Sequence, residues 1–384
     1  MTIEGELIVR LDCSERRVRR VTVRSTRPVI AARVLLGKTA IDAAAMVPKL
    51  FSLCGGAQGA AAAVALAAAG ATAFKAEAGS HDREVLLESI QDTFWHLLID
   101  WPNTMGHVPA TAPVTAARFQ IASATRGADG TTQLHDTAVM RELGARLAAI
   151  ATQAVFGMPP AAWLELADVA ALRSWCGRGG TLPAVLLGNI LTDLPTLGRS
   201  ATPLMPAVRA EALLQVMLPA LRGDPAFGRA PTWDGTPVET GALARMHELP
   251  LVHALQEQFG NAVVTRIVAR LAELAQMTLE MAGMPAPVSG PRRVGSMALG
   301  HGEGLASVET ARGLLLHHAR VHEECVGDYQ IVAPTEWNFH PGGALTRGLE
   351  NLAFDDEPWL HRAARLAVHA LDPCVACRVE VVHA

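Results

Sequence analysis

Residues 302–338 read GEGLASVETARGLLLHHARVHEECVGDYQIVAPTEWN, a segment in which short apolar runs are separated by polar groups. Short apolar runs around Ser307, Leu314 and Ile331 predict β-strands, because runs of this length with β-branched residues fit a buried sheet. A last helix is predicted from Gly348 to about Ala370. The C-terminal part of the chain is therefore expected to mix strands with helix.

Two short polar groups of this segment lie in apolar settings. They are Glu-Thr-Ala-Arg-Gly at 309–313 and Pro-Thr-Glu-Trp-Asn at 334–338. An arginine and a threonine that flank a pair of strands would make good hydrogen-bond donors to an anionic ligand, which singles out Arg312 and Thr335. The alternative is an ordinary surface arginine and a turn threonine.

Upstream of this segment the hydrophobic pattern changes twice. In the first 25 residues apolar and polar residues alternate around a polar break at 14–17, which predicts a β-hairpin. From Ala40 to residue 284 apolar residues follow helical spacing, with Pro, Gly and Asn clusters between the helices. The predicted helices are 41–50, 55–66, 84–98, 140–156, 161–175, 206–221 and 249–281, and the predicted loops are 102–136 and 223–240.

These patterns predict a single domain over residues 1–384, of the α+β class and mainly α. It would comprise an N-terminal β region (1–36), a helical body (37–284) and a mixed segment (285–384) that carries the motif DPCVAC. Neither long loop separates segments of different character, which favours one domain over two.

The composition narrows the class of protein. Half of the 384 residues are apolar, 18% are charged and the formal net charge is −4, so nucleic acid is not an expected partner. The most apolar window, 54–74, is mostly Ala and Gly, which predicts a buried helix with close neighbours and no membrane span. The N-terminal sequence lacks the pattern of a signal peptide, so we expect a cytoplasmic protein with reduced thiols.

Three of the six cysteines are candidate metal ligands. Cys374 and Cys377 have a spacing at which two thiolates can bind one metal ion, and Pro373 before them ends the preceding helix. Cys54 precedes an Ala-rich helix, whose dipole favours a thiolate. The alternatives are a structural or redox pair or a chance spacing for the first two, and a small core residue for Cys54.

The neighbouring histidines His317 and His318 also suggest a metal cluster, together with His322 and Glu323. Their spacing does not match His-Glu-x-x-His, and alternation along a strand would place the two neighbours on opposite faces of a sheet. We therefore interpret them as core or surface histidines.

Six segments of this chain, in the same order, resemble the large subunit of nickel-iron hydrogenases, and they span nearly the whole length. The last three of them are specific as a set. The segments are TIEGEL (2–7), Cys54-Gly55, GALAR (241–245), ETARG (309–313), YQIVAPTEWN (329–338) and DPCVAC (372–377).

In that family two Cys-x-x-Cys pairs hold nickel, and the second cysteine of each pair bridges to an iron that carries cyanide and carbon monoxide. The resemblance implies three metal ligands, three residues that contact the cyanide and carbonyl groups, and one relict of the family's proton relay. They are, in that order, Cys54, Cys374 and Cys377; Arg312, Thr335 and Pro334; and Glu4.

Three departures from the family pattern change what the resemblance implies. Ala57 stands where the second cysteine of the first pair belongs, so nickel would keep three of its four thiolates and the bridge one of its two. Stable nickel binding and hydrogen splitting are therefore not expected. Ala32 and Glu380 replace a carboxylate and a histidine near the family's magnesium site, which puts magnesium in doubt.

This combination is similar to the large-subunit-like maturation proteins of the HupK/HoxV type. The resemblance implies a non-catalytic scaffold that transiently holds an Fe(CN)2(CO) fragment and passes it to the hydrogenase large subunit. Its further partners would be maturation chaperones and the machinery that assembles the iron fragment. The alternatives are a divergent hydrogenase large subunit with an altered metal site, and a metal-free mimic that binds maturation chaperones.

Overall fold

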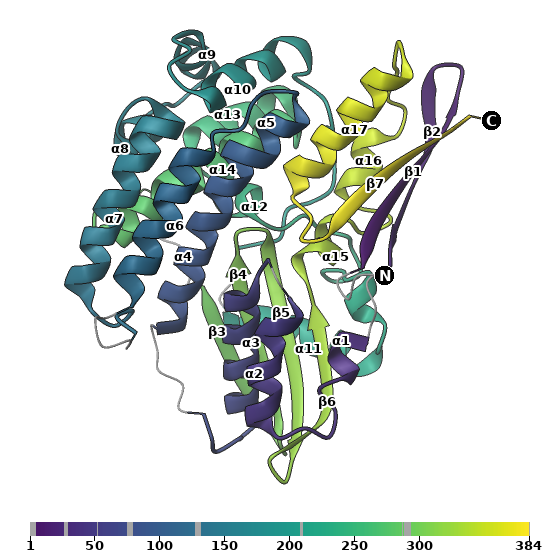
Figure 1. The fold of residues 1–384 in the computed structure, drawn as a ribbon. Coiled ribbons are helices and arrows are strands. Elements are labelled where there is room, and N and C mark those ends of the chain that lie inside the picture. Colours follow the sequence, from purple (N-terminus) through teal and green to yellow (C-terminus); the bar gives the residue numbers. More distant parts are fainter. Residues whose placement is uncertain are drawn as a thin grey trace.

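The computed structural model describes residues 5–26, 30–51, 53–74, 80–126, 132–207, 210–285, 287 and 293–383 (Figure 1). Strands from the two ends of the chain meet in a three-stranded sheet of order β2-β1-β7. The predicted hairpin is confirmed as β1 (Glu6–Ser14) and β2 (Arg17–Ser25). The third strand, β7 (Ala376–His383), runs parallel to β1 and pairs Cys377 with Leu7.

A second sheet is antiparallel and has the strand order β3-β4-β5-β6. Its strands are β3 (Val294–Gly300), β4 (Glu303–Thr310), β5 (Gly313–His322) and β6 (Cys325–Val332). The predicted strand runs are thus confirmed, and each is longer than the sequence suggested. Figure 1 shows α2 (Ala40–Leu50) and α3 (Gly55–Ala68) on one face of this sheet and α11 (Ala210–Gly223) on the other.

Alternation along the strands separates the two faces of this sheet. Ala306 and Ala319 pack in a cluster with the alanines of α3. Leu305 and Leu316 pack in a different cluster, with the leucines of α11. The predicted buried helix with close neighbours is confirmed, because small side chains on α3 allow its backbone to approach the sheet.

The helical body lies beside the sheets and is built around α14 (Val263–Met281), which is buried on nearly all sides. The other helices of this body are α4 (Ser80–Trp95) with a π-helical turn (His96–Asp100), α5 (Trp101–Thr104), α6 (Thr111–Thr125), α7 (Thr137–Ala151) with a second π-helical turn (Thr152–Phe156), α8 (Pro160–Leu164), α9 (Val169–Gly177), α10 (Leu182–Asp193), α12 (Ala242–Met246) and α13 (Pro250–Phe259). The remaining helical pieces are α1 (Ile30–Arg33), a 3-10 turn (Phe227–Arg229), α15 (Pro334–Asn338), α16 (Ala344–Leu349) and α17 (Glu357–Leu371).

Several sequence-based boundaries were wrong. The segment 102–136 was expected to be a loop, but it contains α6, because Pro113 lies in the first turn of that helix, where proline is tolerated. The single helix expected over 249–281 is two helices, separated at Gly260, whose φ of +70° ends α13. The helix expected over 161–175 is likewise interrupted, and Asp168 caps its second half through the Ala171 N–H.

The helix expected from Gly348 to Ala370 is also two helices. The first, α16, ends at Leu349, and the second, α17, begins at Glu357. Asp356 caps the second helix by accepting a hydrogen bond from the Trp359 N–H at 2.6 Å. The intervening turn has an asparagine, Asn351, at a φ of +63°, a conformation that a helix excludes.

The close approach of α3 to the sheet gives a first testable prediction. A Cβ added at Gly304 of β4 would lie 2.3 Å from the carbonyl oxygen of Ala65 and 2.4 Å from the backbone nitrogen of Ala69. Because both contacts are backbone, Gly304→Ala should destabilise the protein by about 1–3 kcal/mol. Urea unfolding measures this loss. Gly177→Ala, at a helical glycine with open space around it, is the control, and an equal loss there would contradict the prediction.

Candidate functional site

The site is centred on a pair of buried cysteines from distant parts of the chain. Cys54 occupies the N-cap position of α3, and Cys374 follows α17. The helix α17 ends because Asp372 adopts a left-handed conformation with a φ of +52°, which turns the chain back toward α3. A hydrogen bond with the Cys374 thiol, and burial, raise the pKa of the Cys54 thiol. The two sulfurs therefore face one another away from water.

Thr335 holds Cys374 in place. Its hydroxyl oxygen accepts a hydrogen bond from the Cys374 N–H at 3.1 Å and lies 3.0 Å from the Cys374 sulfur. Pro334 is the first residue of α15, where its fixed φ suits a helix start, and its side chain is buried. Thr335 thus lies against the Cys374 sulfur, and the contacts of Thr335 and Pro334 with cyanide or carbon monoxide stay predictions.

Arg312 brings a buried positive charge to the cysteine pair. Its Nη1 donates a hydrogen bond to Asp92 Oδ2 at 2.6 Å. Its Nε forms an ion pair with Asp372 Oδ1 at 3.6 Å, which is too long for a hydrogen bond, and this buried Nε has no hydrogen-bond partner among the described residues. Burial lowers the pKa of Arg312, but Asp372 and Asp92, followed by Cys374 and Cys54, raise it well above its ordinary value.

Asp372, which lies near Arg312, has two further buried partners, Arg270 and His96. Arg270 Nη1 donates to Asp372 Oδ2 at 3.0 Å, and His96 Nδ1 lies 3.5 Å from the other oxygen of the same carboxylate. Burial raises the pKa of Asp372, but Arg312, His96 and Arg270 hold it well below its usual range. The Asp372 carboxylate is therefore charged, and its ion pairs hold the side chains of Arg270 and Arg312 in place.

The backbone of Arg312 is itself fixed by the neighbouring loop. Asn338 donates a hydrogen bond to the Arg312 carbonyl at 3.0 Å and accepts one from the Thr240 N–H at 2.8 Å. Gly241, in the GALAR segment, has a φ of +104°, and a Cβ there would lie 3.1 Å from the Arg312 carbonyl oxygen. Three of the sequence segments that carried the resemblance thus meet behind one arginine.

Cys377 has different surroundings from Cys54 and Cys374, which are both buried. It lies half-buried on β7, and burial, followed by the charge of Glu6, raises the pKa of its thiol to about 12. Within the described ranges, no three His, Cys, Asp or Glu side chains are grouped so that they could hold a metal ion. Two of the three predicted cysteine ligands are brought together, and the third remains a prediction.

Other residues singled out from the sequence have ordinary surroundings or are not described. Glu4 lies outside the described residues. Ala32 is part of the short helix α1, and Glu380 lies on β7 in an ion pair with Arg378 at 2.8 Å. Ala57, at the position of the missing bridging cysteine, is fully buried in α3.

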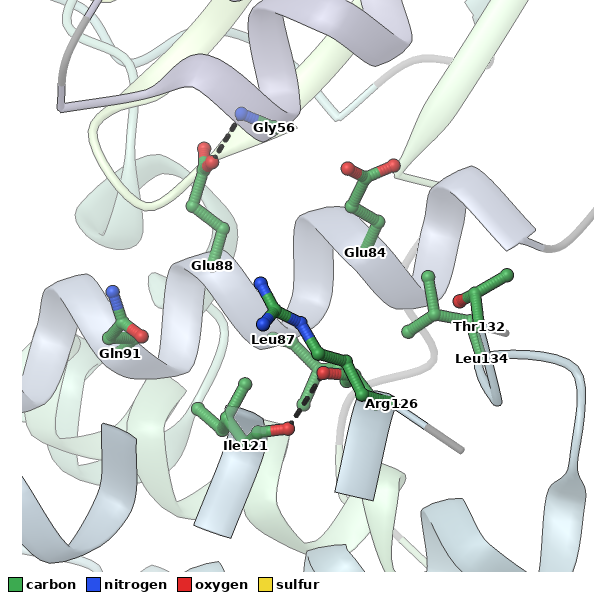
Figure 2. A pocket seen from close by; sticks show the side chains of 10 residues that line it. Gly56, Glu84, Leu87, Glu88, Gln91, Ile121, Arg126, Thr132 and Leu134 are labelled. Atoms are coloured by element: carbon green, nitrogen blue, oxygen red, sulfur yellow. Dashed lines mark hydrogen bonds between the residues drawn. The ribbon is translucent and has the colours of Figure 1, made fainter. Parts of the chain in front are cut away.

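Sequence reasoning missed Glu88, which borders the site from α4. Its carboxylate accepts hydrogen bonds from the Gly56 N–H at 2.6 Å and the Ala57 N–H at 3.1 Å, and so caps the start of α3. Figure 2 shows this carboxylate directed at Gly56. Glu88 and Glu84, one turn away on α4, both line a pocket of about 480 Å³. The contact joins two helices, so no local pattern in the sequence could reveal it.

Glu88 gives a second testable prediction, on pH dependence. Burial, followed by the charge of Asp92, raises the pKa of Glu88 to about 7. Unfolded Glu88 loses its proton near pH 4.5, whereas the folded protein retains it to about pH 7. In that window the unfolded state binds fewer protons, so this side chain makes the free energy of unfolding fall as pH rises.

The measurement compares urea unfolding of the wild type and Glu88→Gln from pH 4 to pH 8. The wild type should lose up to about 3 kcal/mol relative to the variant across this range, with little further change above pH 7. Glu84→Gln, one turn away on the same pocket wall, is the matched control. Parallel curves for the wild type and Glu88→Gln would contradict the assignment.

Comparison with known proteins gives the family of this chain. The family model for nickel-dependent hydrogenases matches residues 293–380. The chain is 32% identical to the hydrogenase expression/formation protein HoxV of Cupriavidus necator, over 92% of this chain and 91% of that protein. The chain belongs to the HoxV/HupK family of hydrogenase expression/formation proteins. Another member, HupK of Azotobacter vinelandii, is 31% identical over 99% of both chains.

Solved structures show the same fold as this HoxV/HupK family member. The nickel-iron-selenium hydrogenase of Desulfovibrio vulgaris Hildenborough in the reduced state aligns over 94% of both chains, with a TM-score of 0.62 and 18% identity. The corresponding hydrogenase of Desulfomicrobium baculatum aligns over 95% of both chains, with a TM-score of 0.54 and 14% identity. The expected hydrogenase large-subunit-like fold, α+β and mainly α, is confirmed. Across the described ranges, no helix combines the length and hydrophobicity needed to cross a membrane.

Proposed function

We propose that this protein is a non-catalytic scaffold in nickel-iron hydrogenase maturation. It transiently holds an Fe(CN)2(CO) fragment and passes it to the hydrogenase large subunit. The names of its relatives, hydrogenase expression/formation proteins, support the coarser part of this proposal, a role in maturation. The buried sulfur pair and its charged surroundings support the finer part.

The observation that carries the proposal is the Nε of Arg312, which makes no hydrogen bond among the described residues, near the two sulfurs. Two thiolates, Fe²⁺ and two cyanides sum to a charge of about −2, which a buried site must compensate with cations and hydrogen-bond donors. The Nε of Arg312 is buried and lacks a hydrogen-bond partner among the described residues, so it is available to a cyanide nitrogen. A buried donor without a partner costs about 1–3 kcal/mol, and a bound cyanide would recover that cost.

The number of sulfur ligands favours reversible binding of the iron fragment over its permanent incorporation. Cys54 and Cys374 offer two ligands to an iron whose other positions the diatomic groups largely fill. Ala57 supplies no bridging sulfur, so the nickel site of a hydrogenase would be incomplete. We infer that nickel is not bound and that hydrogen is not split, while Ala32 and Glu380, in place of the family's carboxylate and histidine, put magnesium in doubt.

The scaffold would need partners that supply the iron fragment and a partner that receives it. Maturation chaperones and the machinery that assembles the iron fragment would supply the cargo, and the hydrogenase large subunit would receive it. Nucleic acid and membrane are not among the proposed partners. Each of these steps takes place in the cytoplasm in this proposal.

Infrared spectroscopy and metal analysis test the proposal. The protein is purified from cells that express the hydrogenase maturation machinery, and it should show cyanide and carbon monoxide bands with iron and without nickel. On mixing with metal-free large subunit, the bands should leave the scaffold and appear on the recipient. Nickel with hydrogen-dependent dye reduction would instead identify a divergent hydrogenase. Absence of iron and of the bands, under conditions that load a true large subunit, would identify a metal-free mimic.

A further inference from the structure

A buried chain of hydrogen-bonding groups leads from the four-stranded sheet to the sulfur of Cys54. The Tyr329 hydroxyl on β6 lies 2.7 Å from His317 Nδ1 on β5. His317 Nε2 lies 2.9 Å from Gln58 Oε1 on α3. Gln58 Nε2, in turn, donates to Cys54 Sγ at 3.8 Å, from one helical turn along the same helix.

The three side chains of this hydrogen-bond chain, those of Tyr329, His317 and Gln58, are almost completely shielded from water. His317 is 0% exposed, Gln58 is 1% exposed and Tyr329 is 4% exposed. Strand alternation directs His317 toward α3 and His318 to the opposite face, where it contacts Glu303 at 2.6 Å, as the sequence predicted for two neighbours. An unpaired polar group at this depth would be costly, so the chain has to be complete from Tyr329 to the sulfur.

The chemistry of the groups fixes the direction of the chain. The Gln58 amide nitrogen faces the sulfur, so its oxygen faces His317 and must receive a proton from Nε2. Burial lowers the pKa of His317 to about 3, so the ring is neutral and its other nitrogen, Nδ1, is an acceptor. The Tyr329 hydroxyl then donates to Nδ1. All three hydrogen bonds are polarised toward Cys54, and each strengthens the next.

We propose that Tyr329, His317 and Gln58 form a positioning device that holds a polarised N–H donor on the sulfur of Cys54 and thereby weakens the bond of this sulfur to the iron. The inference rests on the proposed function, since it concerns how the site releases its cargo. A hydrogen bond to a thiolate withdraws electron density from the sulfur, so the sulfur donates less to the metal. Cys54 would then be the ligand that exchanges first on transfer.

The test removes the donor without changing the size of the side chain. In Gln58→Leu the sulfur should donate more strongly to the iron, so the carbon monoxide band should move to lower wavenumber. Transfer to metal-free large subunit should slow by about threefold to tenfold, the size of one ordinary hydrogen bond. Tyr329→Phe, at the far end of the chain, should give a smaller shift in the same direction.

The matched control is Gln330→Leu. Gln330 neighbours Tyr329 on β6 and donates to the Leu221 carbonyl at 3.0 Å, so the substitution removes a similar hydrogen bond outside the chain. A role that is only structural would affect both glutamine variants alike, by lower stability and no band shift. An unshifted band with unchanged transfer in Gln58→Leu would overturn the proposal.

A second measurement separates this inference from the scaffold function. If the wild type carries no cyanide or carbon monoxide bands, the proposed function fails, and the chain is then examined in the metal-free protein. Nitrogen-15 NMR of labelled histidines should show His317 protonated at Nε2 and bare at Nδ1, and Gln58→Leu should disturb that preference. A proton at Nδ1 in the wild type would reverse the chain and overturn the inference.

Discussion

Replacing Cys374 by alanine should remove the cyanide and carbon monoxide bands from the purified protein and lower its bound iron at least about tenfold. This sulfur lies at the centre of the site, hydrogen-bonded to the Cys54 thiol and 3.0 Å from the Thr335 hydroxyl. Its removal leaves one sulfur of the proposed pair, Cys54, which alone cannot hold the fragment against the cost of burying its charge. Infrared spectroscopy and iron analysis of protein from maturation-competent cells measure both effects.

A cysteine outside the site provides the control. Cys176 on α9 is buried, and burial raises the pKa of its thiol to about 11, so Cys176→Ala removes a similar side chain with no expected effect on loading. Full cyanide and carbon monoxide bands in Cys374→Ala would contradict the proposal that Cys374 binds the iron fragment.

The remaining cysteines decide which pair holds the iron. We propose Cys54 with Cys374 as that pair, because their thiols are hydrogen-bonded to one another, so Cys54→Ala should also lose the bands, whereas Cys377→Ala should retain them. The sequence resemblance placed Cys377 among the ligands, next to the same iron. Loss of the bands in Cys377→Ala with retention in Cys54→Ala would move the holding pair to Cys374 and Cys377.

Sequence patterns were sufficient for those parts of the fold that depend on local periodicity. Alternating residues predicted the hairpin of β1 and β2, and the run of Ala and Gly predicted that α3 is buried with close neighbours. Periodicity did not predict the parallel pairing of β7 with β1, because pairing between the two ends of a chain leaves no local signal. It also missed α6, where Thr and Pro residues imitate the composition of a loop.

The site divides in the same way. The candidate residues Arg312, Thr335 and Cys374 were identified from motifs, and in the structure Cys374 contacts Thr335 and contributes to the raised pKa of Arg312. The partners that make them a site come from elsewhere in the chain, such as Asp92 for Arg312 and Glu88 for the start of α3. Such contacts depend on tertiary packing, so a single sequence contains no pattern that reports them.

Removing the charge of Arg312 should cause a large loss of stability even without cargo. In Arg312→Leu the buried carboxylate of Asp92 loses the partner that it contacts at 2.6 Å, and Asp372 loses one of its positive neighbours. Breaking a buried pair by removing one partner costs about 3–5 kcal/mol, because the other charge stays buried. Urea unfolding of the metal-free protein measures this loss, and adding Asp92→Asn to the same variant should recover part of it.

Two further variants separate the charge of this arginine from its hydrogen bond to the cargo. Arg146→Leu removes an exposed arginine that pairs with Glu142 one turn away, and stability should change there by less than about 1 kcal/mol. Arg312→Lys retains a buried cation for Asp92 but lacks the Nε–H, so it should unfold much closer to the wild type and still load less iron fragment. Full loading in Arg312→Lys would show that charge alone is sufficient. A loss of stability in Arg312→Leu no larger than in Arg146→Leu would show that the buried ion pairs of Arg312 do not contribute to the free energy of unfolding.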